Sequence, residues 1–177
     1  VQVADLNADG LLDQISIHHD RTVSARISTG GGQFADPVST ELAVTPTAFE
    51  LADLNTDDRP DLVVLSQSDE AIEILFGLAG ARFATSATLA SSANTSDLRI
   101  ADVDGDGNLD VVTTKLTKTE NVIIYRGAGG GVMGGPSSVT LGNSELISLE
   151  VADANGDGLA DLFITDGQTG FSFAAGI

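Results

Sequence analysis

Short stretches in which apolar and polar residues alternate recur along the chain and predict β-strands. At four places two apolar side chains stand two residues apart with a polar residue between them, the pattern of a half-buried strand. The apolar pairs are Val1 and Val3, Phe49 and Leu51, Leu98 and Ile100, and Leu149 and Val151. The intervening polar residues, expected on the opposite face, are Gln2, Glu50, Arg99 and Glu150.

Two further apolar segments follow each alternating stretch. The first of them reads QISI from Gln14, LVVL from Leu62, VVTT from Val111 and LFIT from Leu162. The second, after a short polar linker, reads TVSARIS from Thr22, AIEILFG from Ala71, NVIIYRG from Asn121 and GFSFAAG from Gly170. A glycine-rich turn then leads to a weaker segment near Phe34, Phe83 or Met133. These patterns predict units of four short antiparallel strands without helices.

An acidic turn lies between the first and second predicted strands of every unit. Its copies are DLNADGLLD from Asp5, DLNTDDRPD from Asp53, DVDGDGNLD from Asp102 and DANGDGLAD from Asp153. Successive copies therefore begin 48, 49 and 51 residues apart. Four-stranded units with a period of roughly 40 to 50 residues are typical of a β-propeller, in which each unit is a blade that packs on its neighbours.

We therefore expect an all-β fold with four β-propeller blades, the last of them incomplete, in a single region spanning 1–177. The approximate repeats are 1–46, 47–95, 96–146 and 147–177. The alternatives are a β-sandwich and a β-solenoid. Solenoid repeats are usually shorter, and a sandwich gives no reason for the same turn to recur.

Oxygen-bearing side chains occupy positions one, three, five and nine of each acidic turn. They are Asp5, Asn7, Asp9, Asp13, Asp53, Asn55, Asp57, Asp61, Asp102, Asp104, Asp106, Asp110, Asp153, Asn155, Asp157 and Asp161. Ca²⁺ takes six to eight oxygen ligands, and a chain that curls around it presents alternate side chains inward. Mg²⁺ fits less well because it retains several waters, and Zn²⁺ favours His or Cys, which are absent from these turns. We expect three to four bound Ca²⁺ ions.

An EF-hand or dockerin-like loop begins with the same pattern but needs an acidic residue at position twelve and helices on both sides. Position twelve is occupied here by Ser16, Val64, Thr113 and Ile164, all within predicted strands. The sequence therefore argues against an EF-hand and favours a cage closed by the aspartate at position nine.

Charge and composition narrow the classes of partner. The chain has 26 acidic and eight basic residues, for a net charge of −18, and no cysteine. Nucleic-acid recognition requires clustered basic residues, so we expect no nucleic-acid partner. No apolar run is long enough for a bilayer-spanning helix, and we expect no membrane insertion. Fourteen of the 26 acidic residues lie in the four turns, where cations would keep them ionised.

Other chemistry-bearing residues have simpler interpretations. His18 and His19, beside Asp20, could suggest a metal or acid–base site, but no other histidine exists to complete one. The glycine clusters 30–32 and 129–131 lack the lysine of a phosphate-binding loop and are expected to form hairpin turns. No nucleophile elbow is present, so we expect no enzymatic activity.

The segments VADLNADGLLD and IADVDGDGNLDVV resemble the VCBS and FG-GAP repeats, whose calcium loops lie in the β-propellers of integrin α subunits and of many bacterial surface proteins. The resemblance extends over all four units. It implies side-chain ligands at positions one, three, five and nine. It also implies backbone carbonyl ligands at position seven, from Leu11, Arg59, Asn108 and Leu159.

The second turn departs from the family pattern, because Asp58 replaces the usual glycine and Pro60 follows Arg59. Aspartate tolerates a left-handed backbone better than most residues, so the turn is expected to form but to bind its ion less tightly.

The resemblance implies a non-enzymatic, calcium-stabilised module of a secreted or cell-surface protein, used for adhesion, ligand binding or assembly. A carbohydrate-binding lectin is the first alternative, although exposed aromatic residues suited to sugar stacking are few, with seven Phe, one Tyr and no Trp. Part of a secreted hydrolase or lyase is the second. Propellers of this family typically have about six to eight blades. Further blades are therefore expected from the same longer chain or from a neighbouring chain.

Overall fold

The computed structural model describes residues 1–141, 146–166 and 171–174, and its regular elements are all β-strands. Two compact units, Val1–Ser91 and Ser92–Ile177, make up the chain. Among the described residues, no helical segment has the length and apolar character that a bilayer crossing requires.

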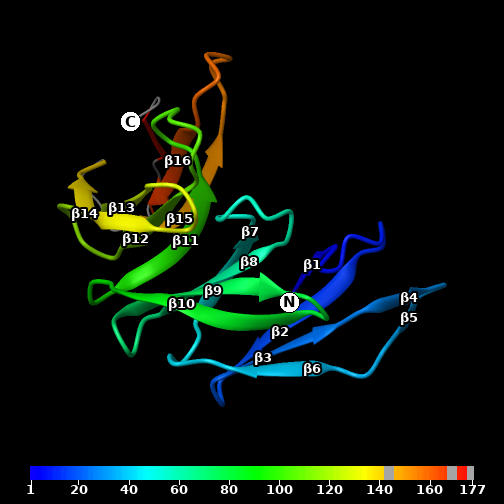
Figure 1. The fold of residues 1–177 in the computed structure, drawn as a ribbon. Coiled ribbons are helices and arrows are strands. Elements are labelled where there is room, and N and C mark those ends of the chain that lie inside the picture. Colours follow the sequence, from blue (N-terminus) through cyan, green and yellow to red (C-terminus); the bar gives the residue numbers. More distant parts are fainter. Residues whose placement is uncertain (142–145, 167–170, 175–177) are drawn as a thin grey trace. The chain divides into compact units, whose positions relative to one another are not determined.

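The first sheet contains four antiparallel strands in the order β1-β2-β3-β6. They are β1 (Gln2–Ala4), β2 (Asp13–His18), β3 (Thr22–Arg26) and β6 (Val38–Glu41). A separate hairpin of β4 (Ser28–Gly30) and β5 (Gln33–Phe34) projects beyond this sheet (Figure 1).

The hairpin corrects one detail of the sequence prediction. Phe34 was expected to lead into the fourth strand of the repeat, but it lies in β5, and the fourth strand begins at Val38. The cause is the glycine cluster: Gly31 and Gly32 adopt positive φ angles of 60° and 77°, which closes a tight turn and pairs β4 with β5.

The second sheet of this unit has the order β7-β8-β9-β10, all antiparallel. Its strands are β7 (Ala48–Ala52), β8 (Asp61–Ser66), β9 (Ala71–Leu78) and β10 (Arg82–Ala90). Every residue of β8 is buried. Side chains from both sheets form one core that includes Ile15, Val23, Leu62, Val64 and Leu75. Two blades of this unit thus share a single hydrophobic interior.

The second unit repeats the arrangement with sheets of order β11-β12-β13-β14 and β15-β16-β17. Its strands are β11 (Thr95–Ala101), β12 (Asp110–Lys115), β13 (Val122–Gly127), β14 (Met133–Val139), β15 (Leu146–Ala152), β16 (Asp161–Asp166) and β17 (Phe171–Ala174). The shared core includes Val112, Ile124, Leu149 and Leu162. Parts of the predicted GFSFAAG strand lie outside the described residues.

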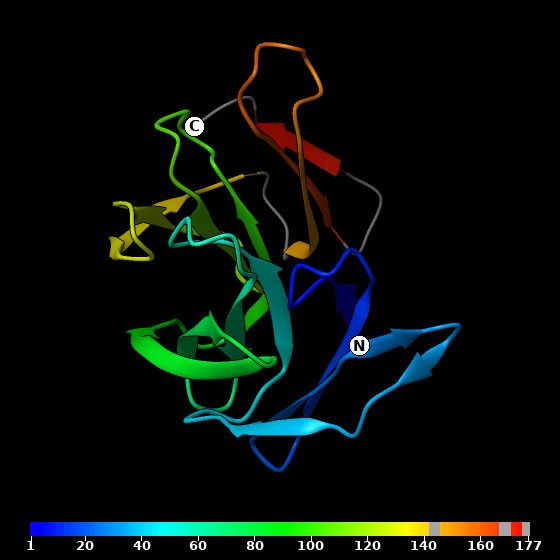
Figure 2. The same cartoon turned by 45° about the vertical axis from the view of Figure 1, so that its right-hand side comes forward.

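The predicted order of strands and turns is confirmed in the described residues. Each acidic turn connects the first strand of its sheet to the second, and Figure 2 shows the turn between β15 and β16 extending past the ends of these strands. Position twelve lies within β2, β8, β12 and β16, which excludes the EF-hand. The clusters 30–32 and 129–131 lie at hairpin turns, as expected.

One predicted strand face is exposed rather than buried. The counterparts of Val1 in later repeats, Phe49, Leu98 and Leu149, are buried. In β1, Val3 is 60% exposed and the neighbouring Val1 79% exposed, because no segment of the first unit covers this face. The alternation correctly predicts the strand, but burial depends on a neighbour that the pattern does not reveal.

Polar side chains connect the first strands of successive sheets within each unit. The Gln2 side-chain amide donates to the backbone carbonyl of Phe49 at 2.8 Å. Asp97 accepts a hydrogen bond from the backbone N–H of Leu149 at 2.9 Å. Since strands at a sheet edge have unpaired backbone groups, these bonds satisfy some of them and fix neighbouring blades to each other.

A buried glutamate fastens the connection between the two sheets of the first unit. Glu73 in β9 is fully buried. One of its carboxylate oxygens accepts the backbone N–H of Ala43 at 2.8 Å, and the other accepts the Thr85 hydroxyl at 2.7 Å. A buried carboxylate is tolerated because both oxygens are hydrogen-bonded.

We expect Glu73→Ala to lower the free energy of unfolding by about 2–4 kcal/mol, since it leaves a buried N–H and a hydroxyl without an acceptor and opens a void. The matched control is Glu41→Ala, at an exposed position of β6, which should change it by less than about 0.5 kcal/mol. Urea denaturation of the three proteins measures both values. Equal stability of the two variants would contradict a stabilising role for the Glu73 hydrogen bonds.

Candidate functional site

The four acidic turns, 5–13, 53–61, 102–110 and 153–161, are named loops one to four. In every loop the aspartate at position one accepts the backbone N–H of position six. The donors are Gly10, Asp58, Gly107 and Gly158, and the distances are 2.8, 2.8, 2.8 and 3.0 Å. One side chain therefore bends each loop into a ring.

The side chains at positions three and five also accept backbone N–H groups of their own loop. The side-chain oxygen at position three accepts the backbone N–H of position five, at 3.0, 3.0, 3.3 and 2.8 Å in loops one to four. The aspartate at position five accepts the N–H of position seven, at 2.8, 3.0, 2.8 and 2.9 Å. These bonds hold the three oxygen-bearing side chains on the inside of the curve.

A left-handed backbone at positions four and six makes this curl possible. At position six the φ angles are 83° for Gly10, 64° for Asp58, 89° for Gly107 and 86° for Gly158. Position four is also left-handed, as Ala8 and Thr56 show with φ angles of 60° and 59°. Asp58 thus replaces glycine with the same backbone shape and the same hydrogen bond. Its left-handed conformation carries a strain that glycine avoids.

The aspartate at position nine has a different role from the others. It is fully buried in all four loops, as Asp13, Asp61, Asp110 and Asp161. One oxygen accepts the N–H of position two, at 2.9, 2.9, 3.0 and 2.9 Å. In loops one to three the other oxygen accepts the backbone N–H of Ser28 in β4, Gly77 in β9 and Gly127 in β13, at 2.7, 2.8 and 2.7 Å. The ninth side chain ties the loop to the sheet.

Burial and backbone donors shift the pKa values of these carboxyl groups in opposite directions. Burial raises the pKa of Asp61 and of Asp110, against the effect of their backbone N–H donors. The backbone N–H of Gly10 lowers the pKa of Asp5, and the N–H of Asn108 lowers that of Asp106. The lowered pKa values of Asp5 and Asp106 favour the charged form of these two carboxylates, which a cation requires.

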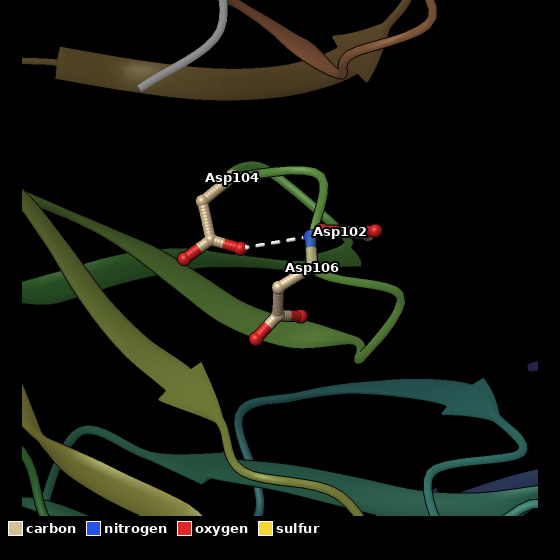
Figure 3. Close-up of side chains that lie close together, drawn as sticks. All are labelled: Asp102, Asp104 and Asp106. Atoms are coloured by element: carbon tan, nitrogen blue, oxygen red, sulfur yellow. Dashed lines mark hydrogen bonds between the residues drawn. The ribbon is translucent and has the colours of Figure 1, made fainter.

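Loop three brings three carboxylates together. One oxygen from each of Asp102, Asp104 and Asp106 lies within 4.8 Å of the others, and the close-up shows all three side chains on the same turn (Figure 3). Oxygens bound to one Ca²⁺ lie at most about 5 Å apart, twice the usual Ca–O distance. The triad therefore fits a divalent cation and could hold one. The other loops have an asparagine at position three.

The remaining predicted ligands are placed as follows. In all four loops the side chains at positions one, three and five accept backbone N–H groups of their own loop, and their role as cation ligands stays a prediction. Whether position nine and the carbonyls at position seven touch a cation stays a prediction, and the ninth carboxylate already bonds the backbone. Outside the loops, exposed His18 has Nε2 3.1 Å from the Ser24 hydroxyl.

The sequence interpretation missed two glycines, Gly77 in β9 and Gly127 in β13, against which the loop backbone packs. A Cβ atom on Gly77 would lie 2.4 Å from the carbonyl oxygen of Pro60, and one on Gly127 would lie 2.4 Å from that of Leu109. Glycine is required at both places so that the loop backbone can approach the strand. The recurring FG and RG at the ends of AIEILFG and NVIIYRG were the available signal.

Comparison with known families identifies the class of protein. The FG-GAP-like repeat model matches residues 5–64 and 53–113, and the chain belongs to this family. The two matches contain loops one to three. Loop four lies outside them but has the same hydrogen bonds. Comparison with curated proteins finds no match.

Solved structures similar to this chain support the propeller fold. A lectin of Agrocybe aegerita that recognises non-reducing terminal N-acetylglucosamine has a TM-score of 0.73 and 22% identity, covering 99% of this chain and 48% of that chain. Two crystal structures of BBS1N in complex with ARL6DN give TM-scores of 0.64 and 0.65 at 14% identity, covering 98% of this chain and 52% of theirs. The chain thus spans about half the length of these relatives and has the fold of FG-GAP β-propeller blades.

We expect Gly127→Ala to lower the free energy of unfolding by about 2–3 kcal/mol, because the added methyl group collides with a backbone carbonyl that cannot move independently. Gly135→Ala is the matched control: a Cβ at Gly135 meets no atom within 4 Å, and its change should stay within about 0.5 kcal/mol. Denaturant unfolding of both variants measures the difference. A Gly127→Ala protein as stable as the control would refute the close approach of loop and strand.

Proposed function

We propose that loops one to four each bind Ca²⁺ and that the ions stabilise a non-enzymatic propeller module. The observation that carries the proposal is the hydrogen-bond pattern that all four loops share, together with the clustering of Asp102, Asp104 and Asp106 in loop three. Membership of the FG-GAP-like family supports the choice of Ca²⁺. The chain's contribution is to position these oxygens, and the ion's is to neutralise their charge.

The module is proposed to act outside the cell or at its surface, in adhesion, ligand binding or assembly. Loops of this kind can remain loaded where Ca²⁺ is millimolar, as it is outside cells. The absence of a nucleophile set in the sequence supports a binding role over catalysis in a secreted hydrolase or lyase.

A complete propeller is proposed to include further blades. The chain spans about half of the propeller chains it matches, and Val1 and Val3 in β1 are exposed. Exposed apolar strand faces are usually covered in soluble proteins.

Carbohydrate binding is the second candidate function. It rests on the similarity to the fungal lectin, which extends over 99% of this chain. Glycan-array binding with an N-acetylglucosamine competitor tests it directly. Failure to bind any glycan would contradict this candidate.

Calcium removal is expected to destabilise the fold. An ion present at 100 times its dissociation constant contributes about 2.7 kcal/mol per site, so an excess of chelator should lower the melting temperature markedly. The calcium-dependent increment is the rise in melting temperature between chelator and Ca²⁺. Asp9→Ala should remove about one site's share of it. Asp36→Ala, an equal charge change at an exposed position outside the loops, should leave that increment intact.

Calorimetric melting of each protein with Ca²⁺ and with chelator gives the increments, and isothermal titration gives the number of ions. An identical melting temperature in chelator and in millimolar Ca²⁺ would refute calcium as a stabiliser.

Assembly is tested on the protein as it occurs in its source. Intact mass and sedimentation are expected to show these residues either within a polypeptide much larger than 18.1 kDa or in an oligomer. A compact, stable monomer of 18.1 kDa would contradict the need for further blades.

A further inference from the structure

The third loop differs from the others at two positions that lie in contact. Position three is Asp104 in loop three but asparagine in the other loops. Arg126 in β13 places Nη1 2.6 Å from Asp104 Oδ2. The pair is partly buried, with side-chain exposures of 38% for the arginine and 27% for the aspartate. Its attraction is therefore less screened by water than that of a fully exposed pair.

The equivalent position in the first two blades is apolar. Arg126 immediately precedes Gly127, whose N–H is held by the ninth-position aspartate of loop three. Ile27 precedes Ser28 and Phe76 precedes Gly77, the corresponding donors to loops one and two. Across loops one to three, the arginine thus occurs at this position where position three is aspartate, and an apolar residue where it is asparagine. Loop two has a different pair, in which Arg59 at position seven places Nη1 3.3 Å from Asp57 Oδ2.

The loops consequently differ in how their inner oxygens are satisfied. In loops one and four, the asparagine at position three donates its amide N–H to the aspartate at position five, at 2.9 Å in both. In loop three this neutral donor is replaced by a carboxylate and a guanidinium. The Arg126 guanidinium also lowers the pKa of Asp106, though less than the hydrogen bonds between Asp106 and Asn108 do. The positive charge of Arg126 therefore acts on more than one carboxylate of the triad.

We propose that Arg126 is an affinity-determining residue of loop three, which weakens divalent-cation binding there by repelling the cation from a carboxylate that both would share. The inference rests on the proposed function, since it concerns cation binding by the same loops. It means that loop three, despite having four carboxylates, is not the tightest site. It also means that the Arg126 side chain holds loop three when no Ca²⁺ is bound, so that this loop keeps its shape at low Ca²⁺.

Arg126→Gln in the full chain is the decisive variant. Removing a unit positive charge next to a divalent cation should lower the Ca²⁺ dissociation constant of loop three about tenfold, the order set by Coulomb repulsion at contact distances in a watery environment. Arg126→Lys keeps the charge and should stay near the parent value. Arg82→Gln removes a charge from an exposed position of β10 and should leave loop three unchanged.

The measurement is a Ca²⁺ titration followed by amide NMR, because the signals of Gly105 and Gly107 report loop three separately. Both N–H groups donate to Asp102, at 2.7 and 2.8 Å. The corresponding signals of Gly10 and Gly158 report loops one and four. Melting in chelator checks that each variant is folded, and Arg126→Gln should be the less stable there because its carboxylates lose a partner.

The outcomes separate the two claims. A tenfold tightening confined to loop three in Arg126→Gln supports the inference. Calcium binding by the parent protein with an unchanged or weakened loop three in Arg126→Gln overturns the inference alone. No calcium response at any loop, in the parent or in Arg126→Gln, overturns the proposed function and the inference with it.

Discussion

The buried carboxylate at position nine is the interaction on which the loops depend. Asp110 accepts one N–H from its own loop, at Val103, and another from the third strand, at Gly127. Burying a charge in this way costs free energy, as the raised pKa of Asp110 shows, and the cost is offset only while both donors are in place. The loop is thereby shaped by the sheet before any ion arrives, and a preformed site loses less conformational entropy on binding.

The position and strand context of the loops could be predicted from sequence because they depend on local patterns. Alternation predicted the strands that flank each loop, and the recurrence of the acidic turn gave the blade period. Even Asp58 in a left-handed turn followed from the tolerance of aspartate for that conformation, and its φ angle of 64° agrees.

The contacts that hold the loops from the far end of the third strand could not be predicted in the same way, because they join residues fifteen or more positions apart. Gly127 was interpreted as part of a strand end, and nothing local shows that its missing side chain admits the carbonyl of Leu109. Asp104 was interpreted as one more ligand, although its distinguishing feature is Arg126, 22 residues further along. The predicted burial of Val3 is wrong for a related reason, because its burial depends on a surface that its own repeat does not contain.

The negative charge of the chain explains why the loops differ in the groups that compensate their carboxylates. Crowded carboxylates raise the free energy of the folded state unless a cation, an arginine or hydrogen-bond donors compensate them. Backbone N–H groups compensate part of this charge in every loop, and Asn7 and Asn155 add neutral donors that leave room for the charge of an ion. Arg126 adds a permanent positive charge instead. A repeat protein can therefore vary cation dependence from blade to blade by exchanging a neutral donor for a charged one, while the ninth-position aspartate keeps the loop in the same place.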